Sequence, residues 1–203
     1  MSINLNLGDC LEAMRAMPDN AYDLAIVDPP YGIDVTKMNM GSRKRAAKDK
    51  NKNWDSAVPN DEYFLELSRV SKRQVIWGGN YFSLPPSQYF AIWDKGETMY
   101  GRDFAECEFA WVSGGGTRIF KKNPNQLDRI HPTQKPVALY EWLLTNYAKK
   151  GQRILDTHLG SGSSAIAAHY FGVDFVGCEL DKSYFDAAKA RFDMATKQLA
   201  MSI

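Results

Sequence analysis

The sequence feature that most constrains the fold is a short apolar run, Asp23-Leu-Ala-Ile-Val, which ends at Asp28 and two prolines. Its residues favour a buried strand, and the strand must end there because proline cannot continue a hydrogen-bonded ladder. An acid that follows such a strand lies at the carboxyl edge of a sheet. In open α/β sheets this edge is where ligands bind. The run therefore predicts an α/β protein with a site at residues 28–31.

The tetrapeptide Asp28-Pro29-Pro30-Tyr31 suits methyl transfer to the exocyclic amine of a nucleobase. That amine is a poor nucleophile because its lone pair is delocalised into the ring, so an enzyme must accept its hydrogens. Asp28 offers carboxylate oxygens, and Pro29 offers a backbone carbonyl on a chain that two prolines restrict. Tyr31 is able to stack on a flat base. A plain strand-to-loop turn is the alternative interpretation.

Asp-Pro-Pro-Tyr after a hydrophobic strand resembles the catalytic motif of the amino-methyltransferases that act on adenine N6 or cytosine N4 in DNA. The resemblance implies that Asp28, Pro29, Pro30 and Tyr31 are catalytic. It also implies S-adenosylmethionine (AdoMet) as the methyl donor, S-adenosylhomocysteine as the product and double-stranded DNA as the partner. The target base would be flipped out of the duplex and methylated directly. Asp at the first position, where other members have Ser, favours adenine N6.

A second strand, Gly151–Asp156, runs into a glycine turn that opens a helix, which is the context of a nucleotide-binding fingerprint. Glu179 ends the next strand, roughly twenty residues after the glycines, where an acid suits ribose hydroxyls. The alternative interpretation is that Glu179 is a helix cap. The turn resembles the Asp-Pro-Phe-x-Gly-Ser-Gly cofactor loop of the same family, with Thr157-His158 in place of Pro-Phe.

Two further segments have a place in the family's cofactor site. His131-Pro-Thr-Gln-Lys-Pro136 matches a segment that lies along AdoMet, where a Lys or Thr meets the methionine carboxylate. The alternative is that His131 and Lys135 are capping and surface residues. Asp9 is a good helix N-cap, and in the family an acid here contacts the adenine together with the next backbone N–H. The predicted cofactor-binding residues are Asp9, Cys10, Asp28, His131, Thr133, Lys135, Asp156, His158, Gly160, Ser161, Gly162, Ser163, Glu179 and Leu180.

Two basic stretches predict contacts to the phosphate backbone of DNA. Residues 33–58 have no convincing period and carry many cations, although a solvated loop would look the same. Residues roughly 95–130, between the catalytic and cofactor halves, occupy the position of a short target-recognition insertion. The predicted DNA-binding residues are Lys37, Arg43, Lys44, Arg45, Lys48, Arg118, Lys121 and Lys122.

Composition narrows the class of protein without naming a reaction. At 203 residues, with 44% apolar and 24% charged residues, the chain fits a single globular domain over residues 1–203. Its three cysteines are far apart, which suits a reducing compartment and gives no metal-binding pattern. No signal segment or membrane span is visible, so we expect a soluble cytoplasmic protein. Related enzymes often form homodimers.

The motifs follow one another in the order of the β arrangement of DNA amino-methyltransferases, which include the modification enzymes of restriction-modification systems. The resemblance implies an α/β, Rossmann-like, mostly parallel seven-stranded sheet with one antiparallel strand, permuted so that the catalytic half precedes the cofactor half. Four alternatives remain. They are N4-cytosine methylation, methylation of RNA or a protein glutamine, a catalytically silent DNA-binding protein, and a NAD-dependent dehydrogenase, which would not explain the tetrapeptide.

Overall fold

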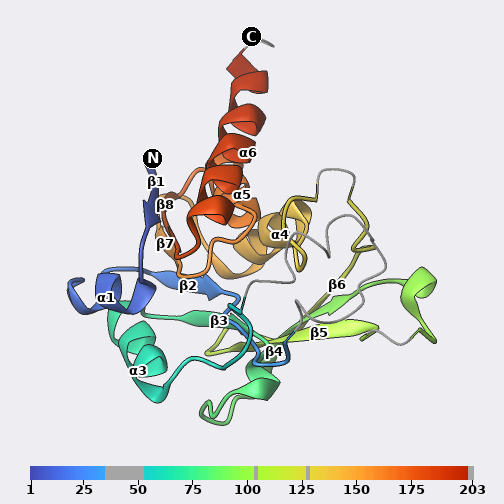
Figure 1. Cartoon of the computed structure of the whole chain (residues 1–203). Helices are drawn as coiled ribbons and strands as arrows, with labels where there is room; N and C mark the ends of the chain where they lie inside the picture. Colours follow the sequence, from blue (N-terminus) through green and yellow to red (C-terminus); the bar gives the residue numbers. More distant parts are fainter. Residues whose placement is uncertain (35–52, 103–104, 127–128, 201–203) are drawn as a thin grey trace.

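Strand β2 (Leu24–Val27) lies in the middle of the sheet and is buried at every position. The computed structural model describes residues 1–34, 53–102, 105–126 and 129–200 (Figure 1). The other strands are β1 (Ile3–Leu7), β3 (Gln74–Trp77), β4 (Tyr89–Asp94), β5 (Cys107–Val112), β6 (Arg118–Lys121), β7 (Arg153–Asp156) and β8 (Asp174–Glu179). The helices are α1 (Cys10–Arg15), α3 (Asp61–Val70), α4 (Val137–Tyr147), α5 (Ser163–Phe171) and α6 (Lys182–Ala200), with the short 3-10 helices η2 (Gly79–Tyr81) and η3 (Glu97–Met99).

The described strands form one mixed sheet in the order β1-β8-β7-β2-β3-β5-β4-β6. Only β5 runs against the others, because it pairs antiparallel with both β3 and β4, whereas β4 and β6 are parallel. The prediction of one antiparallel strand is confirmed. The prediction of seven strands is wrong, since β6 adds an eighth at the edge. That strand lies inside the range predicted as a recognition insertion, where its glycine-rich approach gave no strand pattern.

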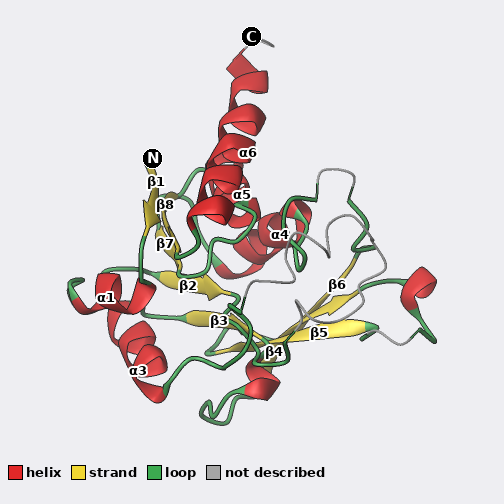
Figure 2. Cartoon of the chain, in the orientation of Figure 1, coloured by secondary structure: helices red, strands yellow, loops and turns green. Residues whose placement is uncertain are grey.

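Helices cover both faces of the sheet (Figure 2). Leu24 and Ile26 of β2 join the core under α4 and α5, whereas Ala25 and Val27 face the opposite core with α1 and α3. This alternation follows from the strand geometry, in which successive side chains point to opposite faces. A strand buried on both faces is typical of the parallel sheets of α/β proteins. The α/β prediction from this run is confirmed.

The local sequence explains where the helices begin and end. Asn60 caps α3 by accepting a hydrogen bond from the Tyr63 N–H, and the helix ends at Val70 because Ser71 is extended. Gly162 precedes α5 with a φ of 73°, in the left-handed region that favours glycine. Among the described residues, no helix is both long and apolar enough to span a bilayer.

Candidate active site

Five parallel strands, β1, β2, β3, β7 and β8, bring their carboxyl ends to one edge of the sheet. The residues at or just after those ends are Asp9, Asp28, Gly78, Asp156 and Glu179. The chain leaves β2 for β3 on one side and leaves β7 for β8 on the other, so the strand order reverses between β2 and β7. Such a reversal is where doubly wound sheets bind their ligands. The structure therefore gathers the predicted catalytic and cofactor residues at one place.

The carboxylate of Asp28 is held by two donors. Its Oδ1 accepts the Tyr31 hydroxyl at 2.6 Å, and its Oδ2 accepts the Lys135 ammonium at 2.5 Å. Burial raises the pKa of Asp28, while the positive charge of Lys135 opposes that rise. Each carboxylate oxygen has two lone pairs, so each keeps one acceptor position beyond these bonds.

Asp55 fixes the turn that carries Tyr31, and the sequence analysis missed it. Its side chain is only 2% exposed, and its Oδ1 accepts the backbone N–H of Tyr31 at 2.7 Å and of Gly32 at 3.0 Å. Its backbone carbonyl accepts the N–H of Asp34 at 2.9 Å. The chain therefore returns to the tetrapeptide after residues 35–52. No sequence signal indicated this role, because Asp55 follows a stretch without a period and its burial is visible only in the structure.

Lys135, which precedes α4, lies against the catalytic turn of residues 28–31 and is only 4% exposed. Besides Asp28, its ammonium pairs with Glu108 of β5 at 3.1 Å, and the other oxygen of Glu108 pairs with Lys95 at 3.0 Å. Burial alone would lower the pKa of Lys135, but the two carboxylates outweigh it, so that pKa lies above its ordinary value. Contact of Lys135 with a methionine carboxylate stays a prediction. Glu108 was not predicted, because it begins a strand instead of ending one.

Aromatic rings surround Tyr31. Its ring stacks on Tyr81 with centroids 4.9 Å apart and planes 12° apart, and Phe82 meets it edge-on. Gly78 has a φ of 69°, and a Cβ built there would lie 2.2 Å from the Tyr31 ring. Gly78 allows both a tight turn and a close approach, because its left-handed backbone lies directly against the tyrosine.

The cofactor loop is organised by two acids. Asp156 accepts the His158 N–H at 3.0 Å and the Ser164 hydroxyl at 2.6 Å, and burial raises its pKa to about 7. Glu179 accepts the Gly160 N–H and the Asp181 N–H, each at 2.9 Å, through different oxygens. The backbone thus orients the Glu179 carboxylate, whose oxygens are able to accept further hydrogen bonds from hydroxyl groups.

Asp9 is the N-cap of α1, accepting the N–H groups of Leu11 and Glu12 at 2.7 and 3.2 Å. The capping interpretation is therefore confirmed. The Gly8 N–H donates to the Glu179 backbone carbonyl at 2.9 Å, which places Asp9 beside the cofactor loop. Burial raises the pKa of Cys10 to about 12, so its thiol stays protonated at neutral pH.

His158 stands where the family loop has Phe, and its ring meets Tyr63 at 5.5 Å in a T-shaped contact. The Tyr63 hydroxyl, the Thr157 hydroxyl and His158 Nδ1 form a chain with spacings of 2.6 and 2.9 Å. Burial lowers the pKa of His158 to about 4, so the ring is neutral at physiological pH. The ring thus packs as an uncharged aromatic at the position where the family loop has Phe.

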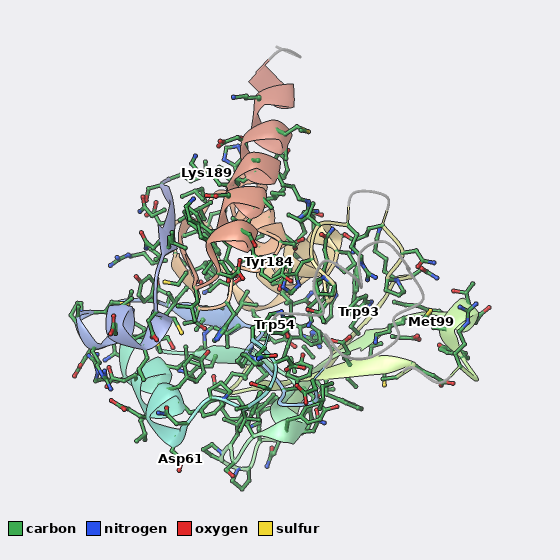
Figure 3. All side chains as sticks on the ribbon, viewed as in Figure 1. Trp54, Asp61, Trp93, Met99, Tyr184 and Lys189 are labelled. Carbon is green, nitrogen blue, oxygen red and sulfur yellow. The ribbon has the colours of Figure 1, made fainter. Side chains whose placement is uncertain are left out.

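The remaining predicted cofactor residues lie nearby with partners of their own. The His131 ring contacts Tyr184 at 4.3 Å and Trp54 at 5.2 Å, and Figure 3 labels both partners. The Thr133 hydroxyl lies 3.2 Å from His131 Nδ1. Arg191 donates to the Ser161 carbonyl at 3.0 Å and to the Ser163 hydroxyl at 2.8 Å. Leu180 is 70% exposed.

The predicted DNA contacts are only partly visible. Lys37, Arg43, Lys44, Arg45 and Lys48 lie outside the described residues. Arg118 and Lys121 are exposed on β6, and Lys122 is exposed just after it. Lys121 pairs with Glu97 at 2.9 Å, which offsets part of its charge. Arg118 and Lys122 keep their role as predicted phosphate contacts.

Comparison with known proteins decides the family. The model of the N6/N4 methyltransferases, described as DNA methylase, matches residues 76–190, more than half of the chain. The chain belongs to this family of DNA methylases. As a DNA methylase of the N6-adenine and N4-cytosine family, it has DNA as its substrate.

Relatives of this DNA methylase match it over nearly all of its length. YubD of Escherichia coli strain K12 is 28% identical over 211 residues, covering 96% of this chain and 91% of the relative. The type II methyltransferase M.HpaI of Haemophilus parainfluenzae is 24% identical over 249 residues, covering 95% of this chain and 75% of the relative.

Solved structures share the fold of this DNA methylase. The M1.HpyAVI–SAM complex superposes with a TM-score of 0.62 at 22% identity, covering 93% of this chain and 99% of that one. The cytosine-N4-specific PvuII DNA methyltransferase gives 0.62 at 12% identity, covering 97% and 91%. The predicted methyltransferase fold is confirmed. The permuted order of its halves stays a prediction.

Proposed function

We propose that this DNA methylase transfers a methyl group from AdoMet to N6 of adenine in DNA, with the base flipped out of the duplex. The observation that carries the proposal is Asp28 at the reversal of strand order, held by Tyr31 and Lys135 and adjoining the loop of Asp156 and Glu179. A base inside the duplex stack cannot bring its amine to such a site, so flipping is required.

The residues of the tetrapeptide have distinct roles in this mechanism. The free lone pairs of Asp28 accept one amine hydrogen, and the backbone carbonyl of Pro29 accepts the other, which localises the amine lone pair for attack. Asp55 and the two prolines hold these acceptors in place before the base arrives, so little reorganisation is needed as charge develops. Asp28 then stabilises the positive charge on the methylated nitrogen until a proton leaves.

The cofactor loop fits AdoMet, which supplies an electrophilic methyl group on its sulfonium. Asp156 holds the glycine turn closed, Gly162 lets the turn pack against Ala188 of α6, and Gly160 leaves open space beside the backbone for a ligand. The oriented oxygens of Glu179 suit the two ribose hydroxyls. The structural relative M1.HpyAVI was solved with SAM, which supports this cofactor.

We expect Glu179→Gln to weaken AdoMet binding about tenfold. The amide keeps one acceptor oxygen but loses the charge that strengthens both the backbone and the ribose hydrogen bonds. Titration calorimetry of the full chain with AdoMet measures the change. Glu97→Gln, a change at an exposed glutamate on η3, is the control and should leave the affinity unchanged. An affinity of Glu179→Gln within twofold of the wild type would contradict the ribose role.

Cytosine N4 is the second candidate target, because the cytosine-N4-specific PvuII enzyme shares this fold over 97% of the chain. The test is incubation with AdoMet and unmethylated DNA, followed by digestion and mass spectrometry of the nucleosides. N6-methyladenine would support the proposal. N4-methylcytosine would mean that cytosine is the target base, with the mechanism unchanged. A product on neither base, with AdoMet binding intact, would overturn the proposal and direct the search to RNA and protein substrates.

A further inference from the structure

Four charged side chains form an alternating row that begins at the catalytic carboxylate. Asp28 pairs with Lys135, Lys135 with Glu108 and Glu108 with Lys95, at 2.5, 3.1 and 3.0 Å. Glu108 reaches this edge because β5 is antiparallel, so the start of β5 meets the carboxyl ends of its neighbours. Lys95 follows the end of β4 at the same edge. The row thus carries no net charge.

The reaction at Asp28 makes this balance important. Methyl transfer forms a carbon–nitrogen bond, breaks the carbon–sulfur bond of the sulfonium and moves its positive charge to the amine nitrogen, which then loses a proton. A lone ammonium beside Asp28 would oppose the incoming charge and would also draw electron density from the carboxylate that must accept the amine hydrogens. Lys135 is buried, so solvent screens its charge only weakly. The Glu108 carboxylate next to Lys135 offsets this positive charge.

We infer that Glu108 is a positioning residue for methyl transfer, which neutralises Lys135 and holds its ammonium so that Asp28 remains a strong hydrogen-bond acceptor. The ion pair with Lys95 offsets part of the negative charge of Glu108. This inference rests on the proposed function and names a residue outside every motif that identified the site.

The groups around Asp28 allow its titration to be read from the pH dependence of activity. Those that influence it are Tyr31 of the same turn, Tyr63 of α3, Glu108 of β5, Lys135 before α4, Tyr140 of α4 and Asp156 of β7. Burial raises the pKa of each tyrosine well above its ordinary value, so the three stay neutral below pH 10. Burial raises the pKa of Asp156 to about 7, and the main influences on it are its own burial, Ser164, His158, Asp28 and Glu179, not Glu108 or Lys95. Differences between variants at Glu108 and Lys95 should therefore report mainly on Asp28. Glu108 raises the pKa of Asp28 and Lys135 lowers it.

The test compares variants of the full chain in kcat and kcat/KM for DNA between pH 5 and 9. In Glu108→Gln we expect kcat to fall about tenfold or more, with KM for DNA little changed. The acid limb of kcat/KM should move to lower pH, because Glu108 no longer raises the pKa of Asp28 while Lys135 still lowers it. Lys95→Met should move the limb to higher pH, since Glu108 is no longer balanced. Glu108→Asp should recover a large part of the lost rate.

Glu141→Gln is the matched control, because Glu141 is exposed on α4 and lies outside the predicted catalytic, cofactor and recognition residues. It should behave as the wild type, and circular dichroism checks that each variant is folded. The inference is overturned if Glu108→Gln matches the wild type, or if Glu108→Gln and Lys95→Met move the acid limb in the same direction. A wild-type chain that methylates no DNA base would overturn both this inference and the proposed function, whereas an active wild type beside an unchanged Glu108→Gln overturns this inference alone.

Discussion

Asp28→Ala is expected to reduce methyl transfer about a thousandfold while leaving AdoMet affinity within a few-fold of the wild type. The variant removes the acceptor that localises the amine lone pair and stabilises charge on the methylated nitrogen, and effects of this kind reach about 10²–10⁴-fold. The fold should survive, because Lys135 keeps Glu108 as a partner at 3.1 Å. Single-turnover methylation at saturating AdoMet, with calorimetric binding of AdoMet, separates the two effects.

Asp23→Ala is a matched control for this variant. Asp23 stands at the opposite end of the same β2 run, where it accepts the Arg153 N–H at 3.0 Å and pairs with Lys72 at 2.8 Å. We expect its methylation rate to stay within about twofold of the wild type, because the effects of distant sites are independent. Wild-type activity in Asp28→Ala would end the role assigned to the tetrapeptide, and an equal loss in both variants would mean that damage to the strand explains the result.

Lys135→Met is expected to lower the free energy of unfolding by about 3 kcal/mol at neutral pH. It leaves two largely buried carboxylates, Asp28 and Glu108, without the cation between them, and removing one partner of a buried pair costs about 3–5 kcal/mol. Urea unfolding of the full chain measures the loss. Lys189→Met serves as the control, because its pair with Asp193 lies on the exposed side of α6 and should contribute less than about 1 kcal/mol.

The same variant has a distinctive pH dependence. Lys135 lowers the pKa of Asp28, so its loss lets burial and Glu108 raise that pKa further above the value in the unfolded chain. A carboxyl group with a raised pKa binds more protons in the folded state, so the variant gains stability as the pH falls through the folded pKa. The difference from the wild type should therefore shrink as the pH is lowered from neutral. A difference that is constant with pH would mean that the loss comes from packing alone.

Much of the site could be predicted because it depends on where parallel strands end. Asp28 follows an apolar run, and Asp156 and Glu179 end two more, so each lies at an edge that the sequence can locate. Local turn chemistry supplied the rest of the cofactor loop, since Gly160 and Gly162 occupy left-handed backbone positions that glycine prefers. These features depend on short-range pattern and on one topological rule.

The missed residues depend on contacts that no local pattern records. Glu108 meets Lys135 only because β5 reverses direction between two parallel strands, and pairing between distant strands is not encoded in the period of either. Asp55 meets Tyr31 across 24 residues, at the end of a stretch without a period. The eighth strand, β6, is short and largely exposed, so it lacks the apolar alternation that predicts a strand.

The hydrogen bonds made by Asp55 also bear on how the sequence between Asp34 and Asp55 can vary. Asp34 and Asp55 are joined by a backbone hydrogen bond of 2.9 Å. The chain therefore leaves the catalytic turn and returns to it at neighbouring positions. Segments whose two ends are pinned together tolerate changes of length at small entropic cost. We therefore expect the tetrapeptide to keep its shape when the number of residues between Asp34 and Asp55 is changed.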